Sequence, residues 1–455
     1  MGKKIIVAGG GHGGITAAAQ LAKAGFDVTV YERHTRENMG WDWFDAIDPR
    51  IFGMVGCPHP EDVGLPWKYR ADILFGGHST DDEHMILQEF DKQEDLEIIM
   101  ERKDLYKLII SFAEKNGVKF EFGTSIKGPV MAGDRVIGIS TDKGDFLADL
   151  VIDAAGFDSP VRLGLPKCLG IQGEVPWGEC VYTYRAFYDL PIPRDQVAKR
   201  DTYKCWFFPD DGEFSFSWVY TQDDYTDILI AHYDKLTMDE VNKLLPIYQE
   251  KNPQLGKNKL RGGQIVHMPL RRPLSVLVAD GYAAIGDAAF MIMPLNGSGI
   301  SISFEISKLL ADAIIADKTE TYSAETLWKY QRDFMKHKGR NLAPVSLVTG
   351  MITDLTPELV DYAFDTGVIT QKELNVVAGQ DSFFQFLHYD SNLPARAKLI
   401  YQNKPLLKAF AMMVMNVVLS YIHSFFLPKE YSRAKVIAWA KKYDKLFTYN
   451  RKKKK

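Results

Sequence analysis

The chain has 455 residues, more than one hydrophobic core usually serves, so we expect two or three substructures. Its composition, 46% hydrophobic and 25% charged, is that of a globular protein and excludes a largely disordered chain. Residues 429–455 carry eleven Lys and Arg against two acidic residues, a local net charge of +9, so the rest of the chain carries −13 of the overall −4. An acidic body with a basic tail argues against a broad basic face for nucleic acid.

The cysteines and the N-terminus indicate the cellular compartment of the protein. The four cysteines have no CxxC spacing and no nearby His cluster, so we expect no metal site, no disulfide scaffold and a reducing compartment. The chain begins with Met-Gly-Lys-Lys and then a short apolar run, which is too short for a signal peptide. We therefore expect a cytoplasmic protein.

The first thirty-two residues predict a nucleotide-binding unit. In chain order they show an apolar strand, a glycine turn, an Ala-rich helix and a second strand, at residues 5–8, 9–14, 16–24 and 27–31. The turn contains Gly9-x-Gly11-x-x-Gly14. We expect Gly9 to allow the tight turn, Gly11 to let the backbone approach a pyrophosphate, and Gly14 to let the helix pack on the strand. The helix N-terminus would offer free N–H groups to the diphosphate.

An acidic residue closes the second strand. Glu32 follows Gly11 by 21 residues and is expected to accept hydrogen bonds from two ribose hydroxyls. A carboxylate there disfavours a 2′-phosphate, which predicts FAD or NAD rather than NADP. His12 and Gly13 in the loop and Arg33 after the strand complete the predicted contacts at this end of the cofactor.

A second strand-to-turn junction indicates that the cofactor is FAD rather than NAD. A strand at 282–285 runs into Gly286-Asp287, and a Gly-rich turn then leads to a helix through about Ala316. FAD is extended and needs such a second site, whereas an NAD dehydrogenase does not. We expect Asp287 to bind the ribityl chain and the turn to meet the flavin edge. The predicted contacts of this turn are Pro294, Gly297, Gly299 and Ile300.

These two junctions, together with the segment 153–162 (DAAGFDSPVR), resemble the FAD-dependent superfamily of aromatic hydroxylases (group A monooxygenases) and geranylgeranyl reductases. The resemblance implies an α/β protein with a Rossmann-like FAD-binding domain of the p-hydroxybenzoate hydroxylase/glutathione reductase type. It also implies an antiparallel-sheet substrate domain, with a helical C-terminal region beyond it. It places Gly156 beside the pyrophosphate and Arg102, at a helix start, near the diphosphate and ribityl.

Within the superfamily the chain is more similar to the geranylgeranyl reductases. Residues 206–209 (WFFP) match the W-x-F-P end of the motif that lines their lipid-tail cavity, which implies that Trp206, Phe208 and Pro209 line the substrate. The tyrosine of that motif is off register, because position 204 is Lys. Where the family often has Cys-Gly near the flavin, this chain has Met39-Gly40-Trp41. Trp41 is predicted either to line the substrate near the flavin or to pack its own loop.

These anchors divide the chain into four parts. We predict a first part of the FAD-binding domain at 1–168, a substrate-binding sheet at 169–275, a return segment of the FAD-binding domain at 276–318, and a helical region with the basic tail at 319–455. Residues 118–156 predict a three-strand meander with two turns. Residues 46–98 show no clear period.

The C-terminal region contains 19 uncharged residues at 409–427. Asn416, Ser420, His423 and Ser424 share one helical face there. Three alternatives stay open: a helix that is buried or lines the lipid tail, a helix lying in a membrane interface, and a true span. Because the basic tail follows this apolar stretch, we expect peripheral contact through 405–455 with the inner face of a membrane.

The predicted activity is that of an FAD-dependent oxidoreductase of lipid metabolism. Reduced flavin would deliver hydride to a C=C bond of an apolar, prenyl or lipid-like substrate. The alternatives are a monooxygenase that uses reduced FAD and O₂, such as an aromatic hydroxylase or halogenase, and a non-catalytic prenyl-binding escort protein. An external donor, NAD(P)H or ferredoxin, would supply electrons, because no second GxGxxG domain is present. Candidate proton donors are His12, Tyr203, Lys204 and Asp42, and the catalytic residue stays unassigned.

Overall fold

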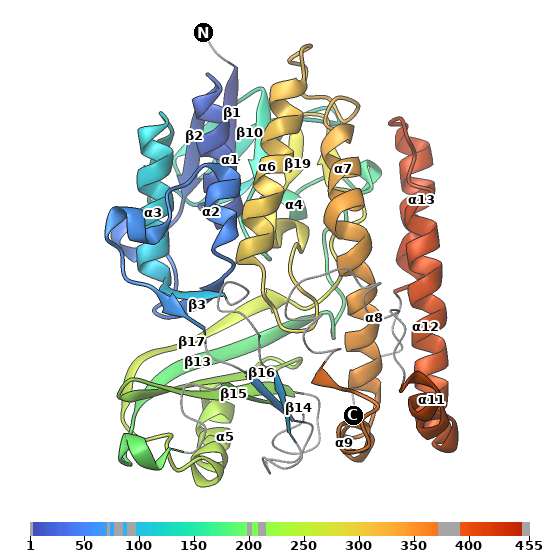
Figure 1. The fold of residues 1–455 in the computed structure, drawn as a ribbon. Coiled ribbons are helices and arrows are strands. Elements are labelled where there is room, and N and C mark those ends of the chain that lie inside the picture. The colour runs from blue at the N-terminus through green and yellow to red at the C-terminus, as the bar shows by residue number, and fades with distance from the viewer. Residues whose placement is uncertain are drawn as a thin grey trace.

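The computed structural model describes residues 3–70, 73–76, 85–88, 97–197, 203–207, 215–371 and 392–447. Figure 1 shows two sheets, one above the other, with a column of C-terminal helices running beside both.

The first sheet is a mainly parallel sheet with the strand order β18-β19-β12-β1-β2-β8. Its strands are β1 (Lys4–Ala8), β2 (Asp27–Glu32), β8 (Lys119–Phe122), β12 (Leu150–Asp153), β18 (Val278–Ala279) and β19 (Tyr282–Ala284). All its pairs are parallel except β18–β19. Ile5, Ile6 and Val7 are fully buried because both faces of β1 are covered, as their continuous apolar run predicted.

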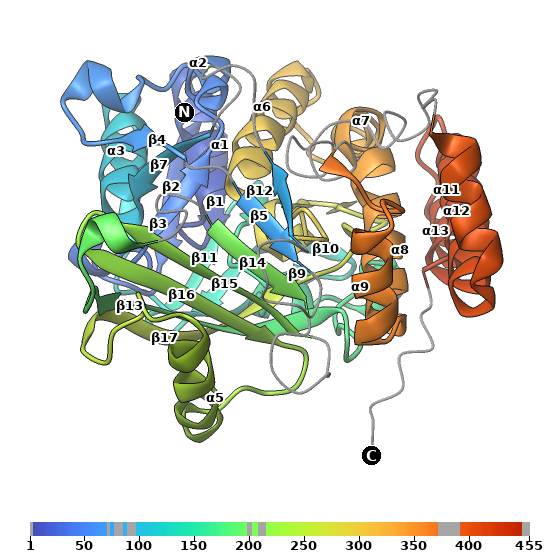
Figure 2. The same cartoon turned by 60° about the horizontal axis from the view of Figure 1, so that its bottom comes forward.

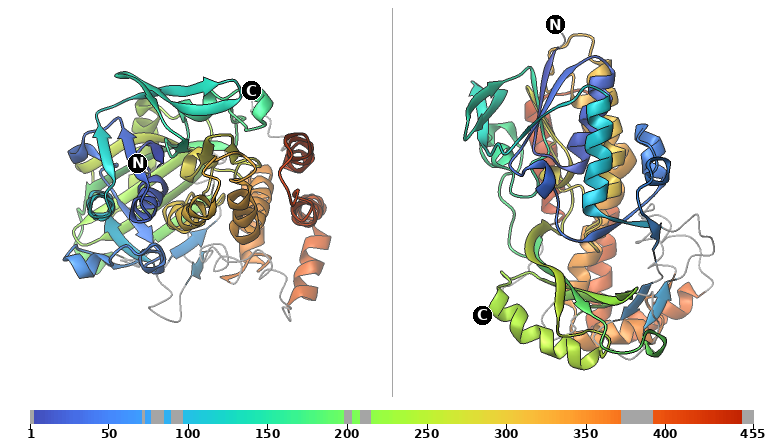
Figure 3. Two further views of the ribbon diagram at one scale, coloured as in Figure 1. Left: turned by 90° about the horizontal axis from the view of Figure 1, so that it is seen from above. Right: turned by 90° about the vertical axis from the view of Figure 1, so that its left-hand side faces the viewer.

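Both faces of the first sheet are packed (Figure 3). Helices α1 (His12–Lys23), α3 (Arg102–Lys115) and α6 (Ile300–Ala316) cover one face. The predicted meander covers the other as β9 (Ile126–Ala132), β10 (Arg135–Thr141) and β11 (Gly144–Leu147), and it is shorter than predicted because β8 and β12, at the two ends of 118–156, pair in the first sheet. Helix α1 begins four residues earlier than the Ala-rich stretch predicted, because Gly11 is its N-cap and two glycines form its first turn.

The second sheet has the order β17-β13-β16-β15-β14-β5-β6 and is antiparallel apart from the β14–β5 pair. Its strands are β5 (Ile73–Gly76), β6 (Ile86–Gln88), β13 (Cys180–Asp189), β14 (Tyr203–Phe207), β15 (Ser215–Gln222), β16 (Tyr225–His232) and β17 (Lys259–Pro269). Helix α5 (Met238–Lys251) closes one face over a core that includes Tyr184, Ile230 and Tyr248. Strands β5 and β6 come from the segment with no clear period, so that segment contributes to this sheet.

A small sheet lies between the two large ones. It has the order β3-β7-β4 and consists of β3 (Phe44–Ile47), β4 (Lys68–Tyr69) and β7 (Ile98–Glu101). Of the short helices, α2 (Arg50–Val55) packs on α6 and α4 (Pro160–Leu163) packs on β9. Because β7 leads directly into α3, the small sheet fixes where Arg102 begins that helix.

The C-terminal region is helical, as predicted. Its helices are α7 (Trp328–Phe334), α8 (Arg340–Asp354), α9 (Pro357–Asp365), α11 (Leu393–Gln402), α12 (Lys404–Ser424) and α13 (Arg433–Lys445), and a π-helical turn at Met335–Gly339 joins α7 to α8. Helix α12 packs on α8, α11 and α13. Figure 2 shows α11, α12 and α13 together at one edge of the molecule.

Candidate FAD and substrate site

The glycine turn between β1 and α1 brings three segments into close contact. Gly9 has φ +91°, which favours glycine, and a Cβ there would lie 2.5 Å from the Cα of Ala155. A Cβ on Gly14 would lie 2.5 Å from the Cβ of Ala154, so this glycine allows the close helix packing that was predicted. A Cβ on Gly11 would lie 2.8 Å from the Ala154 carbonyl oxygen. Gly11 is therefore required by the fold itself, whatever ligand the loop binds.

The N-terminus of α1 offers backbone donors. Gly11 is the N-cap and no side chain caps the helix, so the N–H groups of the first turn point away from the helix without a capping partner. Gly13 packs this turn against α6, since its Cβ would lie 3.0 Å from the Ser303 carbonyl oxygen. The starts of α1 and α6 consequently lie side by side.

Glu32 is held in place at the end of β2. Its carboxylate accepts hydrogen bonds from the backbone N–H of Gly10 at 2.7 Å and of His34 at 2.8 Å, and the residue is 8% exposed. A carboxylate has about four acceptor sites, so two remain for ribose hydroxyls. Arg33 is exposed, and its guanidinium donates to His34.

His12 lies against the start of α3. Its ring packs on Tyr106, tilted by 30° with the centroids 4.5 Å apart, and Arg102 donates to Asp45 at 2.6 Å close by. Burial and the positive charge of Arg102 lower the pKa of His12 to about 3, so its ring is neutral and is a poor proton donor. Its Nε2 atom is buried and has no hydrogen-bond partner within the described ranges. In the tautomer that carries its proton on Nε2, this atom would donate to a phosphate oxygen beside the helix N-terminus.

The second strand-to-turn junction, between β19 and α6, lies beside the first one, between β1 and α1. Gly286–Ala289 form a short 3-10 turn that presents Asp287, and burial raises the pKa of this carboxyl while nearby Arg102 opposes that shift. Asp287 Oδ1 would lie 3.6 Å from a Cβ on Gly299, the uncapped N-cap of α6 before Ile300. Gly297 has φ +77° in the turn.

Pro294 anchors this turn to the C-terminal helices. It is buried, and its carbonyl oxygen accepts a hydrogen bond from Thr349 of α8 at 3.1 Å. This hydrogen bond fixes the turn at the start of α6 to helix α8.

The residues gathered here fit FAD. Glu32 would hold the ribose, the α1 amides and His12 would hold the diphosphate, and Asp287 with the Asp45-paired Arg102 would hold the ribityl chain. The start of α6, which has no side-chain cap among the described residues, would meet the flavin edge, where a helix N-terminus stabilises negative charge. When bound, FAD supplies two-electron redox chemistry, so the protein needs to bind, orient and shield it.

The segment 153–162 acts as a structural clamp beside this site. Asp153 is buried and accepts hydrogen bonds from the hydroxyls of Ser159 at 2.7 Å and Tyr282 at 2.9 Å. Arg162 is buried and donates to the Ala288 carbonyl oxygen at 2.8 Å. These bonds fix the loop that carries Gly156, with φ +83°, against the Gly286 turn.

An apolar face of the second sheet lies opposite the second junction. It consists of buried Val181, Leu229, Ala231, Tyr233 and Leu270, with Phe216, Trp218 and Met268 packed on them. The Met268 Cε would lie 2.9 Å from a Cβ on Gly297, so this face reaches the turn at the start of α6. We call it the apolar sheet face. No motif in the sequence marks this face.

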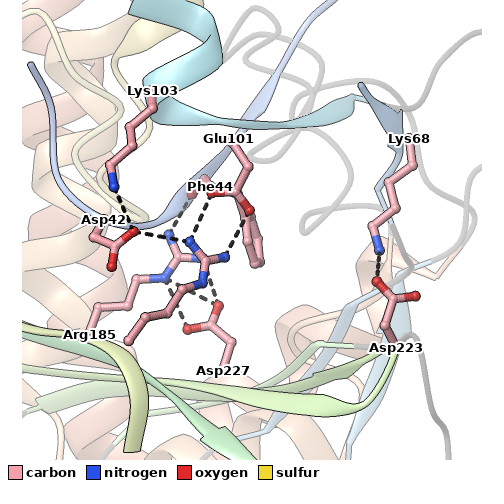
Figure 4. A network of polar contacts seen from close by, with 9 residues as sticks. Asp42, Phe44, Lys68, Glu101, Lys103, Arg185, Asp223 and Asp227 are labelled. Carbon is pink, nitrogen blue, oxygen red and sulfur yellow. Dashed lines mark hydrogen bonds and ion pairs between the residues drawn. The ribbon is translucent and has the colours of Figure 1, made fainter. Parts of the chain in front are cut away.

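A polar network joins the small sheet to the second sheet (Figure 4). Arg185 of β13 donates to Asp227 at 2.6 Å and to the Phe44 carbonyl oxygen at 2.8 Å, and both charged side chains are buried. Arg261 of β17 donates to Glu101 at 2.8 and 2.9 Å. The residues are far apart in the chain, so no motif indicated this network.

The tryptophans after β2 pack within the protein. Trp43 is buried, with the Arg102 guanidinium 4.9 Å and the Arg185 guanidinium 5.5 Å from its ring centroid. Trp41 is half-buried, with its ring 6.1 Å from Trp43. Trp43 therefore packs the loop that follows β2. Contact of Trp41 with the substrate stays a prediction.

The remaining predicted residues are placed as follows. Trp206 lies in β14 opposite Ser217, and Phe208 and Pro209 lie outside the described residues. Of the candidate proton donors, Tyr203 and Lys204 also lie in β14. Asp42 forms ion pairs with Lys103 at 3.4 Å and with Arg261 at 3.5 Å, as part of the polar network.

Known proteins share this fold. The family model of the NAD(P)-binding Rossmann-like domain matches residues 7–58. Digeranylgeranylglycerophospholipid reductase of Sulfolobus acidocaldarius is 21% identical over 379 residues, which cover 81% of this chain and 82% of that protein.

Two solved structures extend the likeness to nearly the whole chain. A geranylgeranyl bacteriochlorophyll reductase-like protein from Thermoplasma acidophilum superposes with a TM-score of 0.69 at 17% identity, over 90% of this chain and 99% of its own. A variant of the halogenase PltM in complex with FAD superposes with a TM-score of 0.61 at 14% identity, over 98% and 95%. The predicted resemblance is confirmed: the chain is an FAD-dependent oxidoreductase with the fold that geranylgeranyl reductases share with flavin-dependent halogenases and monooxygenases.

Proposed function

We propose that this protein reduces C=C bonds of an apolar, prenyl or lipid-like substrate by hydride transfer from reduced FAD. The observation that carries the proposal is the apolar sheet face, which reaches the start of α6 through Met268 and Gly297. An apolar wall beside the flavin edge suits an isoprenoid chain. The likeness to digeranylgeranylglycerophospholipid reductases supports the same substrate class.

In this proposal the chain positions and shields the reaction. Arg102 and Asp287 hold the ribityl chain, and the amides at the start of α6 stabilise negative charge on the reduced cofactor. The apolar sheet face excludes water from the reacting double bond and orients it. The buried pair of Arg185 and Asp227 fixes the second sheet against the small sheet that carries Arg102 through β7. Electrons come from an external donor, NAD(P)H or a ferredoxin.

The experiment compares two fates of the reduced flavin. The FAD-loaded protein is reduced and mixed with a geranylgeranyl lipid, either without oxygen or in air. We expect saturation of double bonds without oxygen, detected by mass spectrometry as two added hydrogens per bond. Substrate-dependent oxygen uptake with a hydroxylated or halogenated product, and no anaerobic saturation, would instead establish the monooxygenase alternative.

Met268 offers a matched pair of variants for the same assay. Met268→Gln keeps the length of the side chain but places an amide on the apolar sheet face, so we expect it to lower prenyl reduction at least about ten-fold while FAD is retained. Met268→Leu conserves volume and polarity and should stay within about two-fold of the parent. Equal activity of Met268→Gln and Met268→Leu would show that this face does not meet the substrate.

A further inference from the structure

Helix α12 turns its apolar side away from the protein. Met412, Met415, Val418, Leu419, Ile422 and, just beyond the helix, Phe426 are between 43% and 67% exposed. They recur every three or four residues and so form one stripe, which extends along most of the helix length of about 30 Å. We call these residues the outer stripe.

The opposite side of α12 faces the protein and combines apolar Leu406 and Val417 with polar residues. Ser420 and Ser424 are buried, and each hydroxyl donates to a backbone carbonyl of its own helix. His423 stacks on Trp439 of α13, and the Trp439 indole donates to the His423 carbonyl oxygen at 3.1 Å. The polar stripe predicted from the sequence therefore lies inside beside Val417, while the exposed side is apolar, unlike the exposed side of a helix on a water-exposed surface.

The packing of α12 favours one of the three predicted alternatives. By length and hydropathy α12 qualifies as a membrane span, and 17% of its most apolar window is buried. A span would be surrounded by lipid, yet α12 packs along α8 and between α11 and α13. Figures 1 and 2 show it at the edge of the molecule with its long axis along that edge. This arrangement suits a helix that lies in the plane of a membrane interface.

The charge around the outer stripe is strongly positive. Residues 392–447 carry ten Lys and Arg against two acidic residues, a net charge of +8, whereas the whole chain has −4. One of the two acids, Asp444, is paired with Arg272 at 2.8 Å, and one of the ten bases, Arg433, is paired with Asp134 at 2.5 Å. Lys404 and Lys408 are exposed on α12 itself. Such a surface complements anionic headgroups, and two copies of it would repel each other.

We propose that the outer stripe of α12 inserts into the boundary between headgroups and acyl chains of an anionic lipid membrane, with the surrounding lysines on the headgroups. The stripe supplies apolar area, and the positive charge supplies attraction to the surface. The proposal stands on the exposure and charge of this region and holds whichever reaction the FAD site performs.

The test is co-sedimentation of the FAD-loaded protein with vesicles of phosphatidylcholine alone or mixed with phosphatidylglycerol. We expect binding to the mixed vesicles that weakens as salt is raised. The double variant Met415→Glu/Ile422→Glu should lower partitioning at least about ten-fold, because it places two carboxylates in the acyl boundary. The matched control is Leu147→Glu, which changes a leucine that is 56% exposed on β11 and should bind as the parent does.

A variant that removes two charges separates the contribution of electrostatic attraction from that of the apolar outer stripe. Lys404→Gln/Lys408→Gln should lower binding to the mixed vesicles by about five-fold for each charge removed and leave binding to neutral vesicles unchanged. Three results would overturn the proposal. They are equal partitioning of Met415→Glu/Ile422→Glu and the parent, retention in the membrane after alkaline carbonate extraction, and a stable dimer in sedimentation equilibrium that Met415→Glu disrupts.

Discussion

Gly11 shows how a single residue in the nucleotide loop serves the fold as well as the ligand. Its absent Cβ would lie 2.8 Å from the Ala154 carbonyl oxygen. We expect Gly11→Ala to lower the free energy of unfolding of the FAD-free protein by about 1–3 kcal/mol, because the loop after β12 must shift. Chemical denaturation measures this.

The control for that variant is Gly53→Ala. Gly53 lies in helix α2, and no atom of the described residues lies within 4 Å of the position that an alanine methyl group would take, so alanine there should stabilise the protein by up to about 1 kcal/mol. If Gly11→Ala were as stable as the parent and lost only FAD, the contact with Ala154 would not be what requires glycine.

Asp287 tests the cofactor site without disturbing a backbone contact. Asp287→Ala should weaken FAD retention by about 1.5–3 kcal/mol, which is the worth of a hydrogen bond to a charged group. Released flavin is measured by fluorescence after gel filtration of the yellow protein. Asp312→Ala, at an exposed ion pair further along α6, should retain FAD fully. Full retention in Asp287→Ala would remove this residue from the site.

The pair of His267 and Asp158 should make the free energy of unfolding depend on pH. Burial alone would lower the pKa of His267, but its contacts with Asp158 at 3.4 Å and with Cys180 raise the pKa from 6.5 to about 9. The charged form is therefore favoured by folding, so this contribution is present below pH 6.5 and is lost as the pH rises through about 9.

The size of that contribution is modest. The Asp158 side chain is 70% exposed, and solvent screening limits the pair to about 1 kcal/mol. Denaturant titrations on either side of this pH window should show the loss in the parent and a smaller one in Asp158→Asn. The same loss in both proteins would exclude the pair as its source.

At the scale of elements, the pair of Arg185 and Asp227 locks β13 and β16 together under the small sheet. Asp227→Ala leaves a buried guanidinium without its carboxylate, so we expect a loss of about 3–5 kcal/mol in the free energy of unfolding. The exposed pair of Lys308 and Asp312 serves as comparison, since Asp312→Ala should cost less than about 1 kcal/mol. Similar losses in both variants would mean that burial adds nothing to the first pair.

Elements with a strong local signal were predictable. The apolar run of β1, the glycine turn and the Ala-rich α1 all follow from neighbouring residues, and only the start of α1 was misplaced, because glycines hide the first turn. Strands β5 and β6 were not predictable, since both are short and β5 joins the sheet by pairing with β14, more than a hundred residues later, while β6 pairs with β5. Ser420 and Ser424 were recognised as one face of a helix, but only packing shows that this face points inward.

At the scale of the whole molecule, the first sheet is assembled from segments on both sides of the second sheet. The two cofactor junctions, about 280 residues apart, meet because α1 and α6 pack on the same face of the first sheet. Motif order predicted this meeting. The apolar sheet face and the polar network were not predictable, because each depends on the register of long antiparallel strands.

The central claim is that reduced flavin in this protein passes hydride to an apolar double bond. Its most direct test is the rate at which the reduced, FAD-loaded protein is reoxidised without oxygen, followed by flavin absorbance after rapid mixing. A geranylgeranyl lipid should restore the oxidised spectrum, with one double bond lost for each flavin reoxidised, and the fully saturated lipid should leave the flavin reduced. A flavin that stays reduced with both lipids and is reoxidised only by oxygen would contradict the account.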